Sequence, residues 1–251
     1  MPAQDQNDLI SRIESWPDFP IEEAHKLNRN RWSDINSPNA QKFSHREPEE
    51  DIINFFDNFG SVIQAPLLDL GCAGGHNLEV AYKRGIFPLY GVDISSAFVS
   101  DALARVPSAE VRAGDMKNLP YEDNYFRTIV ARGVFHLTTA NGLLVVLGEA
   151  NRVMTSSGIL YVMVRHLPDE DEKPRVRKFD EGNKFTYLVY ENPLSENPNQ
   201  NPIMVRNYVQ NQENLREILL YSGFKILEMG NAKQNPERNR KGIYTVCEKI
   251  F

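Results

Sequence analysis

The feature that most constrains the fold is an apolar run that ends in an acid and then turns through glycines. Residues 66–77 read Pro-Leu-Leu-Asp-Leu-Gly-Cys-Ala-Gly-Gly-His-Asn, and an amphipathic segment follows. The pattern predicts a strand, a tight turn and the start of a helix. Gly71 and Gly75 allow the backbone to approach a ligand where a Cβ atom would collide, and a helix start offers unpaired N–H groups.

Two similar units follow along the chain. Residues 88–95 predict a second strand that ends near Asp93, and residues 109–116 predict a third strand with Asp115 just beyond it. With Asp69, these acids would lie along the carboxyl edge of one parallel sheet, which is where α/β proteins bind ligands. An acid one helix and one strand after a glycine turn is suited to accept hydrogen bonds from both ribose hydroxyls. The spacing therefore indicates a nucleoside site.

These segments resemble the class I S-adenosylmethionine-dependent methyltransferases. Residues 69–75 stand where the family has an acid-x-glycine-x-glycine-x-glycine motif, with Ala73 in place of the middle glycine. Asp93 matches the ribose-binding acid of the family, and residues 114–116 match the segment that meets adenine. The resemblance is good over residues 65–164. It implies an α/β, Rossmann-like, doubly wound seven-stranded sheet, mostly parallel with a C-terminal antiparallel strand, and with helices on both faces.

The resemblance also implies S-adenosyl-L-methionine as cofactor and S-adenosyl-L-homocysteine as product. Ala131 and Arg132, at the end of the predicted fourth strand, are expected to line the methionine end of the cofactor, where Arg132 is able to meet its carboxylate. Alanine is the mildest replacement for glycine, so the cofactor site is expected to be intact. The implied cofactor-binding residues are Asp69, Gly71, Cys72, Gly75, Asp93, Ile94, Asp115, Met116, Ala131 and Arg132.

His136 is the candidate catalytic base. It follows the predicted fourth strand, on the edge where the methyl group would lie, and histidine titrates near neutrality. The alternative is a structural role in which His136 packs against or caps the next helix. Methyl transfer from a sulfonium mainly requires alignment and exclusion of water, so the reaction does not demand a base. No spacing of the histidines indicates a metal site.

The class of the methyl acceptor is inferred by excluding classes of methyltransferase whose motifs the sequence lacks. DNA amino-methyltransferases of this fold carry an acid, Asn or Ser followed by Pro-Pro-aromatic after strand four, whereas residues 131–135 read Ala-Arg-Gly-Val-Phe. Neither cysteine follows a proline, and the net charge of −6 argues against a broad nucleic-acid surface. We therefore expect a small molecule with an oxygen or nitrogen nucleophile, and no nucleic-acid partner.

Three other interpretations remain open. In the first, the chain is a catalytically silent protein that binds the cofactor or a partner. In the second, it is a protein methyltransferase. A nicotinamide-dependent oxidoreductase would share the glycine turn and the ribose acid. That class should have glycine at the first, third and sixth positions of the turn, where this chain has Gly71, Ala73 and His76.

The 251 residues, 41% of them hydrophobic, suit one large α/β domain with an appendage. Residues 1–64 are expected to form an N-terminal helical cap or lid, with helices near residues 21–28 and 49–59. Residues 65–251 are expected to form the methyltransferase domain, with an inserted, substrate-covering segment at residues 165–210. Further expectations are a strand-like stretch at residues 185–190, a helix at 212–222, and strands at 225–230 and 242–249.

The fifth helix of the core shows the helical period at Leu143, Leu147, Ala150 and Met154, and Gly158 is expected to support the turn into the next strand. No apolar run approaches the roughly 20 residues of a membrane span, and no signal peptide is evident at the start. Two cysteines do not make a disulfide framework. A cytoplasmic protein without a membrane partner is therefore expected, with the oligomeric state left open.

Overall fold

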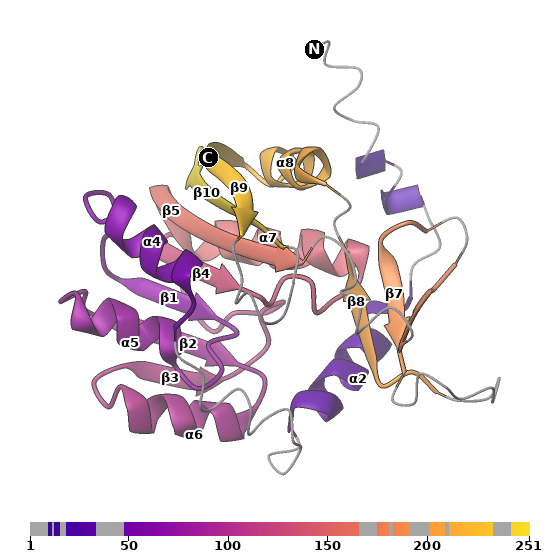
Figure 1. Ribbon diagram of the computed structural model, residues 1–251, viewed down its shortest axis with the longest axis horizontal. Helices are drawn as coiled ribbons and strands as arrows, with labels where there is room; N and C mark the ends of the chain where they lie inside the picture. The colour runs from indigo at the N-terminus through magenta and orange to yellow at the C-terminus, as the bar shows by residue number, and fades with distance from the viewer. Residues whose placement is uncertain are drawn as a thin grey trace.

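A seven-stranded sheet forms the centre of the molecule (Figure 1). The computed structural model describes residues 10–11, 13–15, 19–33, 48–165, 175–180, 183–190, 201–208, 211–232 and 242–251. The strand order in the sheet is β3-β2-β1-β4-β5-β10-β9. The strands are β1 (Leu67–Leu70), β2 (Leu89–Asp93), β3 (Glu110–Ala113), β4 (Phe126–Arg132), β5 (Met154–Arg165), β9 (Phe224–Ala232) and β10 (Gly242–Lys249).

The first five strands pair in parallel, and β10 is antiparallel to both of its neighbours. This confirms the predicted sheet, including the antiparallel strand at its C-terminal end. Parallel strands point their carboxyl ends to the same edge, so the segments after β1, β2 and β4 meet there.

Helices cover both faces of the sheet. Successive strand residues point to opposite sides, and apolar residues on both sides are buried against these helices. Leu68 and Ile129 lie in one apolar core with α7 (Ala140–Val153) and α8 (Gln212–Tyr221). Leu67 and Val130 lie in the other core, with side chains of three further helices. Those helices are α4 (Glu50–Asn58), α5 (His76–Lys83) and α6 (Ser96–Arg105).

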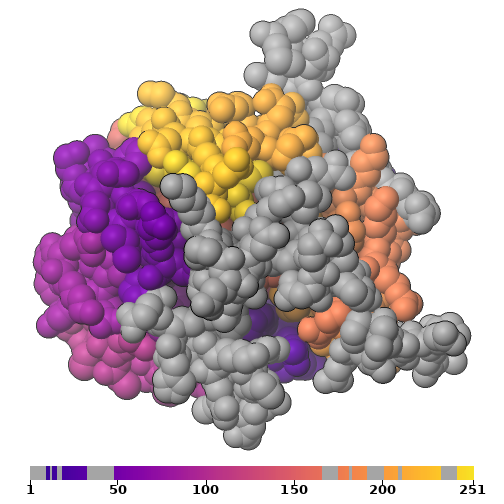
Figure 2. Space-filling model, in the orientation of Figure 1, coloured from indigo at the N-terminus to yellow at the C-terminus, as the bar shows by residue number. Residues whose placement is uncertain are grey.

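A small antiparallel sheet lies beside the main one, with the order β6-β7-β8. Figure 2 shows this sheet, in orange, on the side of the molecule away from α5 and α6. Its strands are β6 (Val176–Lys178), β7 (Thr186–Val189) and β8 (Met204–Asn207). Helix α2 (Ile21–Ser33) packs on β8 through a cluster that includes Phe19, Ala24 and Val205. Strand β7 falls within the stretch that was expected to be strand-like.

Two expectations about local structure were wrong. Met154 does not lie on the helix face, because α7 ends at Val153 and β5 begins directly at Met154. Gly158 lies within β5 rather than in a turn before it. Residues 155–158 bulge from the ladder instead: Met154 pairs with Phe126, the next pair joins Ile159 to Thr128, and Ser157 has a φ of 60°. In addition, α2 extends to Ser33, beyond the expected end at residue 28.

Parts of the expected N-terminal cap belong to the two main cores. Ile10 and Ile13 are buried with α7 and α8, and Ile52 of α4 is buried with α5. The division of the chain at residue 64 therefore stays a prediction, and much of the expected inserted segment at 165–210 lies outside the described residues. None of the helices in the described ranges combines the length and apolar composition that a membrane span requires.

Candidate functional site

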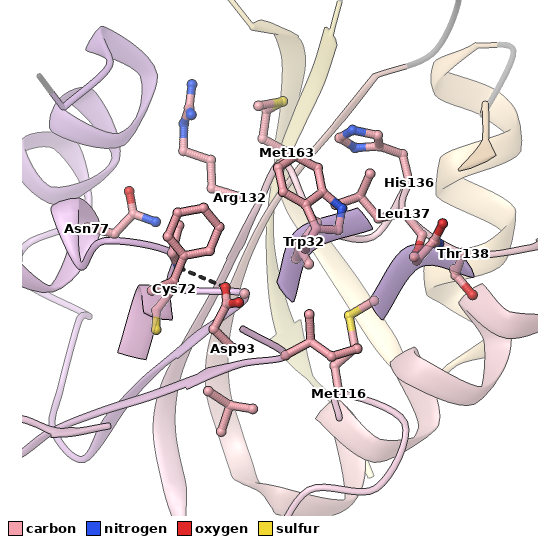
Figure 3. Close-up of a pocket in the computed structure, with 18 of the residues that line it drawn as sticks. Trp32, Cys72, Asn77, Asp93, Met116, Arg132, His136, Leu137, Thr138 and Met163 are labelled. Atoms are coloured by element: carbon pink, nitrogen blue, oxygen red, sulfur yellow. Dashed lines mark hydrogen bonds between the residues drawn. The ribbon is translucent and has the colours of Figure 1, made fainter. Parts of the chain in front are cut away.

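A cavity of about 210 Å³ opens at the carboxyl edge of the parallel strands and is covered by α2. Its floor comes from the segments that follow β1, β2, β3 and β4, and its far end comes from β5 and β8. Figure 3 shows Trp32 of α2 above Asp93, with His136 and Met163 on the side of Trp32 away from Asp93. The cavity therefore spans several strands.

The glycine turn after β1 is held by the end of β2. The amides of Gly71 and Cys72 donate to the Val92 carbonyl at 2.8 and 3.1 Å. Gly71 has a φ of 65°, and a Cβ there would lie 2.4 Å from the Val134 side chain, so the position requires glycine. Ala73 has a φ of 44°, which is the left-handed region that glycine adopts more easily. This explains why the resemblance expects glycine at position 73.

Asp69 and Cys72 are buried beside this turn. One Asp69 oxygen accepts a hydrogen bond from the Asn77 side chain at 3.2 Å, and burial raises the pKa of the Asp69 carboxyl to about 7. The Cys72 side chain packs near Gly91, where a Cβ would lie 3.0 Å from its sulfur. Burial also raises the pKa of the Cys72 thiol well above its usual value, so a thiolate nucleophile is disfavoured.

Asp93 anchors the cavity floor at the end of β2. One carboxylate oxygen accepts the Ala73 amide and the other accepts the Ser95 amide, both at 2.9 Å. Burial raises the pKa of Asp93, although these two hydrogen bonds act in the opposite direction. A carboxylate has about four lone-pair sites, so its oxygens can accept further hydrogen bonds beside those from the backbone. The carboxylate is thereby oriented for a pair of hydroxyl donors such as those of ribose.

Asp115 lies at the next strand end and contacts the covering helix. The Lys117 amide donates to one of its oxygens at 2.9 Å, and Nε2 of His25 lies 3.0 Å from the other. Burial lowers the pKa of His25, while the Asp115 carboxylate acts to raise it. The Lys117 ammonium in turn reaches Glu22 at 2.9 Å. Helix α2 therefore docks directly on the acid that was expected to meet adenine.

Arg132 at the end of β4 is engaged by α4. Its guanidinium donates to both oxygens of Asp51 at 2.8–3.0 Å and lies 3.7 Å from Glu49. The Tyr161 hydroxyl also donates to Asp51 at 2.7 Å. Burial alone would lower the pKa of Arg132, but Asp51 raises it, so the arginine stays charged. In Figure 3 the side chain extends away from Asp93.

His136 is 4% exposed and lines the cavity in the loop that follows β4. Its carbonyl accepts the Asn207 amide of β8 at 3.0 Å, and the Asn207 side chain donates to the Phe135 carbonyl at 2.8 Å. The Leu137 carbonyl accepts the side chain of Asn28 in α2 at 2.8 Å. The loop that positions His136 is therefore fixed by both covering elements.

The structure brings most of the predicted site residues to one cavity. Three of them do not line it: Asp69 is buried behind the turn, Gly75 starts α5 against Ala102, and Ala131 is buried in the core. Ala131 points into the core because alternate residues of β4 face opposite sides of the sheet. The predicted residues that do line the cavity are Gly71, Cys72, Asp93, Ile94, Asp115, Met116, Arg132 and His136.

The sequence did not reveal several polar residues of the site. Asn28, Asp51, Arg165 and Arg206 are each 5–8% exposed. Three of them line the cavity, and Asp51 holds Arg132 from behind. Asp51 lies in the helix that was predicted near residues 49–59, but no local pattern distinguishes a buried acid there. Arg206 lies in the short strand β8 of the small sheet, and that strand carries no motif.

Comparison with known proteins identifies the fold. Residues 68–162 match the family model described as "Methyltransferase domain". None of the curated proteins matches the sequence. The chain is similar to 1,6-didemethyltoxoflavin-N1-methyltransferase from Burkholderia thailandensis, solved with bound 1,6-didemethyltoxoflavin and S-adenosylhomocysteine. The identity is 13%, over 94% of this chain and 93% of that one, with a TM-score of 0.68.

Two further solved structures are similar. A SAM-dependent methyltransferase from Methanosarcina mazei has 18% identity over 77% of this chain and 97% of that one, with a TM-score of 0.61. The [4+2]-cyclase SpnF has 16% identity over 82% of this chain and 85% of that one, with a TM-score of 0.55. At these identities the likeness shows the fold alone.

Proposed function

Because residues 68–162 of the chain form a class I S-adenosylmethionine-dependent methyltransferase domain, we propose that the protein methylates an oxygen or nitrogen nucleophile on a small molecule. The family and its cofactor, with S-adenosylhomocysteine as product, are as the sequence predicted. The acceptor class is our proposal. It is carried by one observation: a single cavity runs from β2 to β5 and lies beneath α2. Such a covered site suits a small molecule better than a nucleic-acid strand or a folded protein.

In this proposal the adenosine part of the cofactor occupies the end of the cavity near β2 and β3. Asp93 accepts the ribose hydroxyls with the lone pairs that its two backbone donors leave available. Asp115 and the Met116 backbone face adenine, with His25 as an additional neighbour. Arg132 supplies positive charge near the methionine end but remains paired with Asp51.

The chemistry requires little beyond this placement. Methyl transfer from a sulfonium is an in-line displacement, in which the acceptor lone pair forms the new bond while the carbon–sulfur bond breaks. The protein must align the two reactants and exclude water. We propose that Trp32 contributes to this exclusion, and that residues 1–64 and 165–210 together form the lid. In support, α2 from the first segment and β8 from the second both bind the loop that carries His136.

Where the nucleophile carries a proton, we propose His136 as the base that removes it. Its position in the loop after β4 supports this role, since it lies along the cavity beyond Asp93 and Trp32. His136→Ala should then lower kcat by ~10²–10⁴-fold and remove the histidine limb from the pH profile, while the affinity for S-adenosylhomocysteine is retained. An unchanged kcat would assign His136 a structural role.

A catalytically silent protein that binds the cofactor or a partner is the main alternative. SpnF has this fold and is named as a cyclase, so the fold alone does not establish methyl transfer. The Burkholderia relative is named as an N1-methyltransferase of a small molecule, which supports the acceptor class proposed here. The two free, buried cysteines are compatible with a reducing cytoplasmic setting, which we also propose.

The test has two stages. Calorimetry should show that S-adenosylhomocysteine binds the wild-type protein and binds Asp93→Asn more weakly. Radiolabelled S-adenosylmethionine should then transfer label to at least one member of a metabolite library, with tRNA, duplex DNA and a cell protein extract as parallel acceptors. Labelling of a macromolecule alone would overturn the acceptor class. Cofactor binding without transfer to any acceptor would favour the silent alternative.

A further inference from the structure

Two buried arginines line the cavity at the end away from Asp93. Arg165 is the last residue of β5, Arg206 lies in β8, and each is 8% exposed. We propose that their guanidinium groups bind an anionic group, a carboxylate or a phosphate, on the methyl acceptor. This inference rests on the proposed methyl transfer and narrows its substrate class.

The sheet order places Arg165 away from the proposed ribose site, at the end of the cavity where we expect the methyl acceptor to bind. Strands β2 and β5 are three positions apart in the sheet, a separation of roughly 14 Å at the usual strand spacing. If Asp93 holds the ribose as proposed, the sulfonium that is attached to it would lie nearer to β1 and β4 than to β5. Arg165 lies two residues after Met163, so both side chains leave the same face of β5. Met163 itself pairs in register with Arg132 and lines the cavity.

Arg206 approaches the same end of the cavity from the small sheet. The next residue, Asn207, binds the His136 carbonyl through its backbone amide at 3.0 Å. The Arg206 guanidinium also donates to the buried hydroxyl of Tyr208 at 3.3 Å, which helps to orient it. One arginine from each sheet therefore lines the part of the cavity that also contains His136.

Neither β5 nor β8 contributes a carboxylate to the described lining of the cavity. Asp93 and Asp115 follow β2 and β3, where each has the protein partners described above. Glu49 precedes α4 and lies beside Arg132, which is balanced by Asp51. Among the cavity-lining residues that the structure describes, the charged side chains contributed by β5 and β8 are thus both cationic.

Arginine is suited to bind an oxyanion because its planar guanidinium offers two parallel N–H donors to a carboxylate or phosphate. Two such groups from different strands would fix both the position and the orientation of a small anion. An acceptor held in this way would present a hydroxyl or amine near His136, which would take the proton as the methyl group is transferred. Electrostatic attraction between the acceptor and the cationic sulfonium would add to the binding.

The test measures probe binding to the wild-type protein saturated with S-adenosylhomocysteine, by calorimetry. The probes are benzoate, phenyl phosphate and the neutral benzamide. An anionic probe should bind at least tenfold more tightly than benzamide, and the tighter of the two anions identifies the group that the site prefers. Arg165→Gln and Arg206→Gln should each weaken anion binding by about tenfold or more, since each removes a charge-assisted pair.

Arg177→Gln is the matched control, because Arg177 is an exposed arginine of the same small sheet. It should leave anion binding unchanged. Thermal unfolding of each variant with S-adenosylhomocysteine confirms that it is folded. A lack of preference for the anions in the wild-type protein would overturn the inference. So would a loss of S-adenosylhomocysteine affinity in the two variants, since the arginines would then hold the cofactor carboxylate. Failure of the wild-type protein to bind S-adenosylhomocysteine would instead refute the proposed function.

Discussion

Asn28 joins the covering helix to the edge of the small sheet, and its removal should loosen the whole cover. Its side-chain nitrogen donates to the carbonyls of Leu137 and Val205 at 2.8 and 3.0 Å, and its oxygen accepts the Val205 amide at 2.8 Å. The carboxamide thus pairs with the outer edge of β8 as a neighbouring strand would. At 5% exposure, water does not replace these bonds while the helix stays docked.

The change we propose is Asn28→Ala. It removes three hydrogen bonds, each with a net value of about 1 kcal/mol, so the free energy of unfolding should fall by about 3 kcal/mol. For a chain of this size, that loss lowers Tm by about 6–12 °C. Asn30→Ala is the matched control, because Asn30 is an exposed asparagine of the same helix.

Thermal and urea unfolding of both variants measure the effect, and hydrogen exchange locates it. We expect exchange to increase in α2, in β8 and in residues 134–138, where the bonds are lost. If the Tm of Asn28→Ala falls no further than that of Asn30→Ala, the carboxamide does not contribute net stability and the reasoning fails. If only the exchange of α2 increases, the helix opens locally without a global loss.

Three other substitutions test the site. Asp51→Ala removes the main counter-charge of the Arg132 side chain, which is 14% exposed, and should cost about 3 kcal/mol by urea unfolding. Asp57→Ala in the same helix breaks an exposed pair and should cost no more than about 1 kcal/mol. Ala73→Gly removes the strain of an alanine with a left-handed backbone conformation and should change the free energy of unfolding by no more than about 1 kcal/mol, with the affinity for S-adenosylhomocysteine retained. A larger loss of stability would show that the Ala73 methyl group makes stabilising contacts with its neighbours. Burial raises the pKa of Asp69 from 3.8 to about 7, so between these pH values the folded protein binds one more proton than the unfolded chain, and the free energy of unfolding falls as pH rises. Asp69→Asn should reduce this dependence of the free energy of unfolding on pH, measured by urea unfolding from pH 4 to 8. An unchanged pH dependence would show that Asp69 does not cause it.

The floor of the cavity was predictable because each of its residues follows a strand with a clear local signal. Apolar runs place two strand ends near Asp69 and Asp93, Asp115 follows the short strand β3, and the glycine turn fixes the start of α5. Parallel pairing then places these ends at one edge of the sheet. The direction of the Ala131 side chain was not predictable, because strand-end position alone does not say which face a side chain takes, and the phase of β4 turns this side chain into the core.

The cover was not predictable in the same way, because long-range polar contacts hold it in place. Apolar contacts of the cover include the small cluster of Phe19, Ala24 and Val205 and the contact between the Trp32 and Phe98 rings. The polar contacts of α2 join residues that are far apart in the sequence, such as Asn28 with Val205 and His25 with Asp115. An asparagine that caps the edge of a strand leaves no periodic pattern in the sequence. The roles of Arg165 and Arg206 were also not predictable, since neither residue lies in a sequence motif.

This arrangement has a consequence for how the site works. Helix α2 contacts Asp115 through His25 at the adenine end and the Leu137 carbonyl through Asn28 near His136. The same helix therefore holds both the acid expected to meet the cofactor and the loop expected to meet the acceptor. Since polar contacts at both ends of α2 contribute to its docking, a ligand that alters either end changes the free energy of closing the cover. By linkage, closure must change the affinity for that ligand by the same factor.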